Sequence, residues 1–345
     1  MTSTKIFDAI WIDDHIGRAQ NWQGSLAGPL RGQDVEISLE MFEVTSNLIT
    51  DITKKLVTWT EKPPSLIIID QKFTKAGRLP FDLHGSALAH LIRLELPHVP
   101  IVCVTAQTID SADFNMEDLS EYTYLFSIDK LSELEQQERL FSIAEDFSKF
   151  CFESKQGVRH LIVQALSAPE SDSAALSSVL PDEFESRFVH GTTPHRIAKW
   201  VLTVLMQRPG FLWDAMDAGT FLGLTQEGFT RVSDQFESAL YKGPFAIETK
   251  PLWWASEIAN ALYEAVPDHA HLRPVDAGRH LPGVQPDDFS KCVVSGETPD
   301  VVVYADSSRL SRFPVCLRYS LPLSEEESSV PGFPPRLRLL NERRG

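Results

Sequence analysis

Acidic, hydroxyl and basic side chains follow four apolar segments in the first 150 residues. Asp13 and Asp14 follow the segment IFDAIWI, and Asp70 follows LIII. Thr105 follows PIVCV, and Lys130 follows the short apolar segment near residue 125. Short apolar runs of this kind predict strands buried on both faces, as in a parallel sheet. Because ligands bind at the carboxyl edge of such a sheet, we expect these five side chains to meet in one shallow pocket.

The chemistry of these residue types fits a metal-assisted transfer reaction. Three clustered carboxylates repel one another and stay ionised most easily around a cation. Mg²⁺ prefers oxygen ligands, so Mg²⁺ is the expected cofactor. An ionised Asp70 can then attack phosphorus as a nucleophile, while Lys130 offsets the charge of the phosphoryl oxygens. The Thr105 hydroxyl can hydrogen-bond a phosphoryl oxygen, and the small Ala106 leaves room for it.

Alternating strands and helices are expected to position this pocket. Apolar runs and period-two alternation predict strands, over residues 6–12, 35–41, 66–70, 99–105 and 125–128. Helical spacing of apolar residues predicts helices, over 45–59, 85–96 and 131–150. The order implies an α/β fold, a doubly wound five-stranded parallel sheet with helices on both faces.

The C-terminal half has a different pattern. Residues 151–181 are expected to extend the long helix and then form a linker, because 168–181 are small and polar. The sequence of residues 182–323 predicts a mainly helical α+β domain, with short strands at 292–295, 301–304 and 315–321. Residues 324–345 are expected to be a mobile tail.

Residues 1–150 resemble the receiver domain of two-component response regulators, a flavodoxin-like fold. The features that carry the resemblance are the acid pair, Asp70, Gly85 at the third helix, the Thr105-Ala106 pair and Lys130. The resemblance implies phosphorylation of Asp70 by a histidine kinase or phosphotransfer protein.

The resemblance also implies the roles of the other pocket residues. Asp14 would bind Mg²⁺ directly, Asp13 through water, and the carbonyl of Lys72 would be a further ligand. Thr105 would be the switch hydroxyl, and Lys130 would contact the phosphoryl group. Three features depart from the family: the segment 70–85 is longer than usual, Leu131 stands where receivers usually carry proline, and Ser127 stands where they usually carry the switch aromatic residue.

Two alternatives to a phosphorylated signalling protein remain open. In the first, the strand-end acids are only solvated and the N-terminal domain is a pseudo-receiver, a docking module. In the second, the receiver controls an enzyme whose active site lies unrecognised in the C-terminal half. A protein-interaction output, through a downstream partner or self-association, is the expected function of that half because it is acidic and dense in aromatic residues.

A helix-turn-helix pattern spans residues 218–232, with Gly223 at the turn and Thr225 as the next helix cap. Residues 211–241 carry five acids and one cation, Arg231, so their net charge is 1 − 5 = −4. Phosphate contacts supply most of the affinity for DNA, so this pattern favours a helix pair packed in a core.

Histidines and cysteines of the C-terminal half form no regular metal-ligand spacing. The residues that could in principle contribute to a zinc site are His269, His271, His280, Cys292 and Cys316. His190 and His195 flank a predicted helix start at Thr192-Thr193-Pro194, where a helix-capping context is expected because no nucleophile motif accompanies them.

The overall composition narrows the class of protein. The 345 residues contain 32 Lys plus Arg and 48 Asp plus Glu, a net charge of −16. This balance argues against general affinity for nucleic acid or anionic membranes. The sequence predicts neither a signal peptide nor a membrane-inserted segment, and its four cysteines form no CxxC pair. We therefore expect a cytoplasmic protein.

Overall fold

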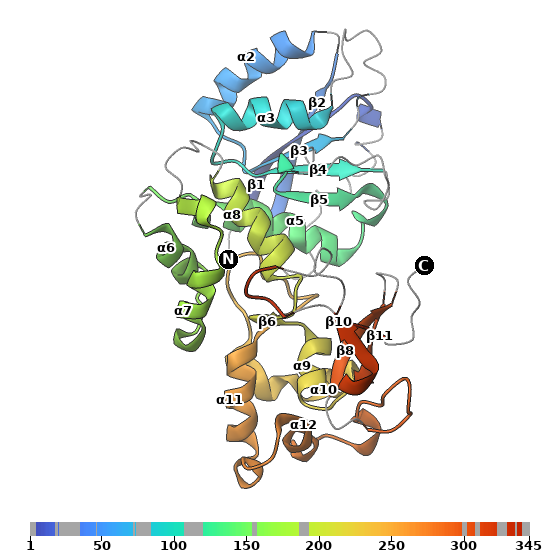
Figure 1. Cartoon of the computed structure of the whole chain (residues 1–345). Helices are drawn as coiled ribbons and strands as arrows, with labels where there is room; N and C mark the ends of the chain where they lie inside the picture. The colour runs from blue at the N-terminus through green and yellow to red at the C-terminus, as the bar shows by residue number, and fades with distance from the viewer. Residues whose placement is uncertain are drawn as a thin grey trace. The chain divides into compact units, whose positions relative to one another are not determined.

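The computed structural model describes most of the chain, in two compact units (Figure 1). The described residues are 5–17, 20, 35–45, 47–71, 73, 84–106, 120–153, 157–185, 193–298, 302–307, 311–322, 330–334 and 337–339. Unit 1 comprises Met1–Ala165, Asp182–Leu202 and Pro244–Thr249, and unit 2 comprises Leu166–Pro181, Thr203–Gly243 and Lys250–Gly345. Neither unit is one continuous segment, whereas the predicted domains are.

Unit 1 is built on a five-stranded sheet in which every pairing is parallel, with the strand order β2-β1-β3-β4-β5. The strands are β1 (Lys5–Asp13), β2 (Val35–Glu43), β3 (Leu66–Asp70), β4 (Ile101–Thr105) and β5 (Tyr124–Ser127). The predicted α/β class is confirmed, and the strand order fits a flavodoxin-like fold. From β1 the chain adds β2 on one side and then β3, β4 and β5 on the other, so the strand order switches between β1 and β3. Ligands of such folds bind at this switch point.

Apolar side chains on alternate positions of the strands build a core on each face of this sheet. Helices α2 (Leu48–Glu61) and α3 (Gly85–Glu95) pack their apolar stripes on one face, against residues such as Ile67 and Ile69. Helix α5 (Leu134–Asp146) lies on the other face (Figure 1). There Phe141 of α5 meets Phe7 of β1 edge to face. Each buried Ile or Leu contributes about 1.5–3 kcal/mol, so both layers stabilise the sheet.

The prediction of one long helix from residue 131 to 166 is wrong, because these residues form two separate helices. After η1 (Ile128–Lys130), α5 ends at Asp146 and a 3-10 turn, η2 (Phe147–Phe150), follows. Cys151 ends this turn with φ of −87° and ψ of 72°, outside the helical region, and a separate helix, α6 (Val158–Ala165), begins later. Phe147 and Phe150 are fully buried, so the tight turn is fixed by packing that helical spacing alone does not reveal.

The predicted linker at 168–181 is also wrong, because most of it forms helix α7 (Glu170–Val179) of unit 2. Pro169 precedes the helix, and Glu170 and Asp172 lie in its first turn, where acidic side chains complement the helix dipole. Leu176 is fully buried and holds the helix against its unit. A segment of small and polar residues can therefore form a helix when a proline precedes it and acidic side chains lie in its first turn.

Two later segments of the chain belong to unit 1. The first, Asp182–Leu202, contains η3 (Asp182–Glu185) and α8 (Thr193–Trp200), and it ends within a π-helical turn at Val201–Leu205. The second, residues 244–249, lies on α5. Asp146 accepts a hydrogen bond from the Phe245 backbone N–H at 2.7 Å, Arg139 donates to the Phe245 carbonyl, and Glu138 accepts from the Thr249 N–H at 2.9 Å.

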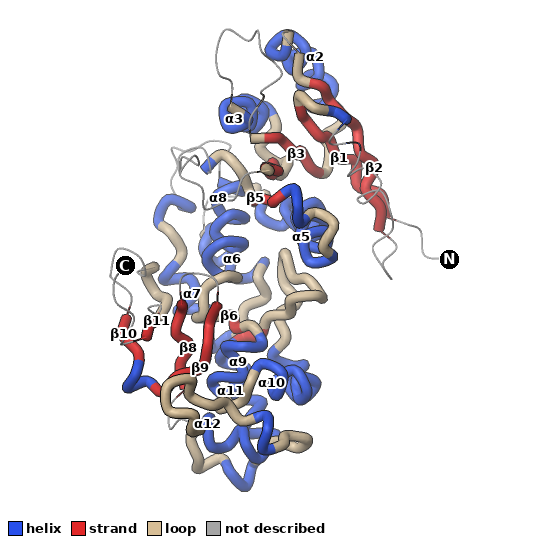
Figure 2. Tube along the Cα trace, turned by 90° about the vertical axis from the view of Figure 1, so that its right-hand side faces the viewer, coloured by secondary structure: helices blue, strands red, loops and turns tan. Residues whose placement is uncertain are grey.

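Unit 2 combines short helices with two small sheets (Figure 2). Its strands are β6 (Leu212–Trp213), β7 (Trp253–Trp254), β8 (Val302–Ser307), β9 (Ser311–Cys316), β10 (Ser320–Pro322) and β11 (Leu337–Leu339). Strands β6 and β7 pair with each other, and the others form a sheet in the order β10-β11-β8-β9. The strand predicted at 292–295 is wrong, since these residues form a turn, and β11 falls in the segment predicted to be a tail.

The helices of unit 2 enclose an aromatic-rich core that includes Phe229, Phe236 and Trp253. Apart from α7, they are α9 (Ala215–Phe221), α10 (Gln226–Val232), α11 (Ala255–Ala265) and α12 (Pro274–Ala277). The 3-10 turns are η5 (Ser233–Ala239), η6 (Pro267–His269), η7 (Gly278–His280), η8 (Pro286–Asp288) and η9 (Leu317–Tyr319). Among the described residues, none of the helices has the length and apolar character needed to cross a membrane.

The predicted helix pair at 218–232 is confirmed as α9 and α10. Gly223 lies between them with φ of +71°, a conformation that glycine adopts without strain. The Thr225 hydroxyl accepts a hydrogen bond from the Gly228 N–H at 3.0 Å, which makes Thr225 the predicted cap of α10. The two helices bury their apolar sides in the core of unit 2, as expected of a helix pair packed in a core.

Candidate metal site at the carboxyl edge of the sheet

The register of the parallel strands brings three of the predicted residues to one edge of the sheet. Ile12 of β1 pairs with Ile69 of β3, so Asp13 and Asp70 lie level as the last residues of neighbouring strands. On the other side of β3, Asp70 pairs with Val104, which places Thr105 at the end of β4. Sequence reasoning identified this convergence because apolar runs ending in polar residues mark the ends of buried strands.

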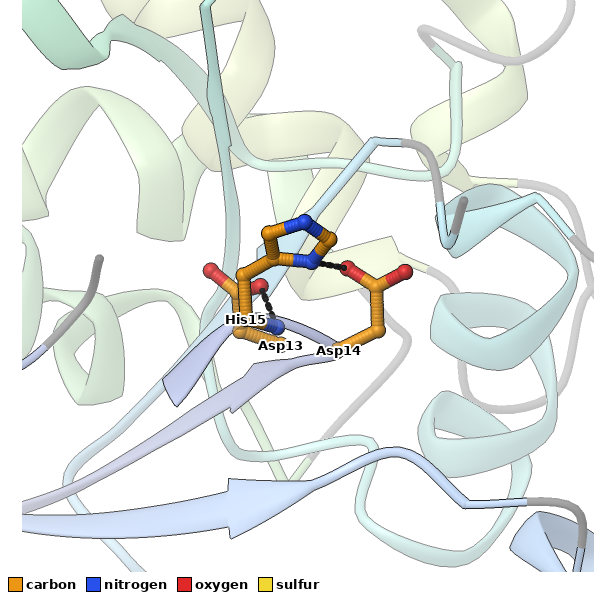
Figure 3. Close-up of side chains that lie close together, drawn as sticks. All are labelled: Asp13, Asp14 and His15. Carbon is orange, nitrogen blue, oxygen red and sulfur yellow. Dashed lines mark hydrogen bonds and ion pairs between the residues drawn. The ribbon is translucent and has the colours of Figure 1, made fainter. Parts of the chain in front are cut away.

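The acid pair is buried at this edge. Asp13 is 2% exposed and Asp14 is 4% exposed. The backbone N–H of His15 donates to Oδ1 of Asp13 at 2.7 Å, and Nδ1 of His15 lies 3.0 Å from Oδ1 of Asp14 (Figure 3). These contacts fold the chain back at the end of β1 and hold both carboxylates beside the imidazole.

Asp13, Asp14 and His15 form the one group of three metal-ligating side chains found in the described part of the chain, with ligand atoms within 4.8 Å of one another. Buried carboxylates close together are costly unless a cation offsets their charge. Their oxygens suit Mg²⁺, and the imidazole nitrogen would also suit Mn²⁺ or another transition metal. The donor set therefore fits a divalent cation.

His15 is a member of this group that the sequence prediction missed. The signal was its position directly after the acid pair, where a turn at the strand end aims successive side chains at the same place. Asp70, which the sequence predicted as a shared ligand, is half-buried on the neighbouring strand and does not belong to the three-residue group.

The position of Asp70 depends on a close approach between β3 and helix α3. A Cβ atom on Gly85 would lie 2.1 Å from the Asp70 carbonyl oxygen and 2.7 Å from the Tyr122 hydroxyl. The Gly85 N–H donates to the carbonyl of Gln71 at 3.0 Å, which fixes the start of α3 beside the strand end. Glycine is required here because any side chain would displace the backbone of Asp70.

Asp70 also affects a neighbouring thiol. Burial and the nearby Asp70 carboxylate raise the pKa of Cys103 well above its usual range. The Cys103 thiol donates to the side-chain oxygen of Gln71, which is itself buried. Cys103 therefore stays a neutral thiol behind the strand ends and takes no part in ionic chemistry.

The remaining predicted pocket residues have different environments. Thr105 is 2% exposed, and Ala106 after it is exposed. Thr105 pairs with Ser127, and Lys130 follows three residues later as the exposed last residue of η1. Lys72, predicted to offer its carbonyl to the metal, lies outside the described residues, as does most of the long segment that follows it.

None of the described histidines considered in the C-terminal half belongs to this three-residue group. His195 is buried in unit 1, where its Nδ1 lies 2.8 Å from the Thr123 hydroxyl and burial lowers its pKa well below the usual range. His190 lies outside the described residues. In unit 2 the rings of His269 and His280 stack 3.8 Å apart, and His271 is exposed.

No family model matches this chain, and no curated protein matches its sequence. Its function is therefore inferred from the geometry at the carboxyl edge of the sheet.

Proposed function

We propose that unit 1 contains a receiver-like phosphoacceptor domain that takes a phosphoryl group onto Asp70 in the presence of Mg²⁺. The observation that carries the proposal is the strand register, which aligns Asp13, Asp70 and Thr105 at one sheet edge. Asp13 and the adjacent Asp14 are buried there. The donor would be a phosphohistidine of a histidine kinase or phosphotransfer protein.

The proposed reaction is an in-line displacement at phosphorus. A carboxylate oxygen of Asp70 attacks, a P–O bond forms, and the P–N bond to the donor imidazole breaks, so the imidazole leaves with the bonding electron pair. The metal, when bound, offsets negative charge on the phosphoryl oxygens. Asp13 and Asp14 would hold the metal, with the Lys72 carbonyl as a further ligand.

Two further residues would stabilise the phosphorylated product. Thr105 would donate its hydroxyl proton in a hydrogen bond to a phosphoryl oxygen. Lys130 is exposed at the end of η1, so its long side chain is free to approach the edge, where its charge would offset that of the phosphoryl group.

The proposal is tested with a small phosphodonor. The full-length protein is incubated with acetyl phosphate and Mg²⁺, and intact mass spectrometry measures the gain of one phosphoryl group. Wild type and the control variant Asp51→Asn, altered in the first turn of α2, should gain it. Asp70→Asn should gain none, and EDTA should abolish the reaction of wild type. Equal phosphorylation of wild type and Asp70→Asn would refute the assignment.

The second candidate is a pseudo-receiver adaptor without phosphorylation. The observation that favours it is the composition of the buried group, in which His15 rather than Asp70 accompanies the acid pair. If wild type takes up no phosphoryl group while still binding Mg²⁺ in a titration, the adaptor is the better description of unit 1.

We propose that unit 2 is a protein-interaction output rather than a DNA-binding one. Arg231, the one cation of residues 211–241, is already paired with the buried carboxylate of Asp288, at 2.5 Å. Strong DNA binding needs several free cations on the helix that enters the groove. Retention of DNA binding in a gel-shift assay at about 200 mM salt would contradict this proposal.

A further inference from the structure

Two cysteines that are far apart in the sequence meet in a small cluster of unit 2. The backbone N–H of Cys316, at the end of β9, donates to Sγ of Cys292 at 3.3 Å. Cys292 is 1% exposed and Cys316 is 6% exposed, and both pack with Val315 and Tyr319. Bond lengths then place Cα of Cys316 within about 4.8 Å of the Cys292 sulfur, which is compatible with disulfide formation.

Backbone hydrogen bonds fix the turn that carries Cys292. The N–H of Cys292 donates to the Glu297 carbonyl at 2.8 Å, and the N–H of Gly296 donates to the Cys292 carbonyl at 2.7 Å. Gly296 has φ of +72°, which closes the turn without strain. The N–H of Val293 donates to the Pro314 carbonyl of β9 at 3.1 Å, so the turn is held against the strand that ends in Cys316.

The electrostatics make the two sulfurs chemically different. Burial alone would raise the pKa of Cys292, but hydrogen bonds from the backbone N–H groups of Cys316, Ser295 and Val294 and from the Ser295 side chain lower it to about 6. Burial and the hydrogen bond to the Cys292 sulfur raise the pKa of Cys316. At neutral pH the pair therefore holds one thiolate, the reactive form of cysteine, beside one thiol.

The other two cysteines lack this environment. Burial raises the pKa of Cys151 to about 11, and Cys103 is a buried neutral thiol of unit 1. The Cys292 turn also lies near the surface, since the next two residues, Val293 and Val294, are about half exposed. A small oxidant therefore needs only a local opening of the turn to reach the sulfur.

We propose that Cys292 and Cys316 form a redox pair that hydroperoxides convert into a disulfide. In the first step the Cys292 thiolate attacks the O–O bond of hydrogen peroxide, giving a sulfenic acid and hydroxide. In the second step the Cys316 sulfur attacks the sulfenic acid sulfur; the S–S bond forms, and the hydroxyl group leaves as water with the thiol proton. The disulfide joins the 292–297 turn covalently to β9, and it is independent of phosphorylation in unit 1.

The test counts thiols and maps the cross-link in the full-length protein. The reduced protein has four thiols. After hydrogen peroxide treatment, two thiols should be lost and the mass should fall by about 2 Da, with one peptide pair joined through Cys292 and Cys316. Dithiothreitol should restore four thiols. The oxidised protein should also melt at a higher temperature, because the disulfide constrains the unfolded chain.

Matched cysteine variants separate the proposed pair from nonspecific oxidation. Cys103→Ser and Cys151→Ser should still lose two thiols, whereas Cys292→Ser should lose none. Cys316→Ser should instead accumulate a sulfenic acid at Cys292, detected as a dimedone adduct. Peptide mapping of the wild-type protein tests the cross-link even if one of the variants fails to fold. The absence of a 292–316 cross-link in peroxide-treated wild type, or the same thiol loss in Cys292→Ser, would overturn the proposal.

Discussion

Replacing Gly85 with alanine tests directly how the fold positions Asp70. The new Cβ would lie 2.1 Å from the Asp70 carbonyl oxygen, about 1 Å inside the closest contact that Cβ atoms make, and this neighbour is backbone rather than a flexible side chain. Such overpacking costs about 1–3 kcal/mol or more. The helix propensity of alanine returns only about 0.5–1 kcal/mol, so we expect a net loss of about 1–2 kcal/mol in the free energy of unfolding.

The assay for this substitution is urea denaturation of the full-length protein, with Gly17→Ala as a control. A Cβ on Gly17 meets no atom within 4 Å, so the control should stay close to the stability of wild type. Under the proposed function, Gly85→Ala should also slow phosphorylation of Asp70, because the collision moves the backbone of that residue. If Gly85→Ala is as stable as wild type and is phosphorylated at the same rate, the close approach of α3 to β3 is wrong.

Three further predictions concern other parts of the molecule. Burial and the nearby Asp214 raise the pKa of Asp217 to about 7, so the folded state binds the proton of Asp217 more tightly than the unfolded state does. The free energy of unfolding should therefore fall by up to about 1.4 kcal/mol per pH unit as the pH rises from about 4 to 7. In urea denaturation, Asp217→Asn should remove that pH dependence. Arg139→Leu leaves the Phe245 carbonyl without its donor and should destabilise the protein by about 1–3 kcal/mol, measured by the same assay; an unchanged midpoint would contradict the contact. Under the proposed function, Asp14→Asn should weaken Mg²⁺ binding about tenfold or more in calorimetry, and equal affinity would exclude Asp14 as a ligand.

The predicted strands were largely correct in unit 1 because each signal was local. A wholly apolar run such as Leu66–Ile69 predicts a strand covered on both faces, and a polar residue directly after it marks the sheet edge. The helix pair around Gly223 was predicted for the same reason, since a glycine turn and a threonine cap act within a few residues. Errors arose at 147–153 and 170–179, where Phe150 packs against Phe245 of a later segment and Leu176 is fully buried.

The sequence by itself determined the strands of the parallel sheet and the residues at their ends, because apolar periodicity and residue type act over a few positions. Only the tertiary structure decided which side chains meet. It joined His15 to the acid pair and residues 244–249 to α5, and it brought Cys292 to Cys316 across 24 positions of the chain. Contacts of this kind depend on turn geometry and strand register, which are set by the packing of the whole unit and leave no periodic signal in the sequence.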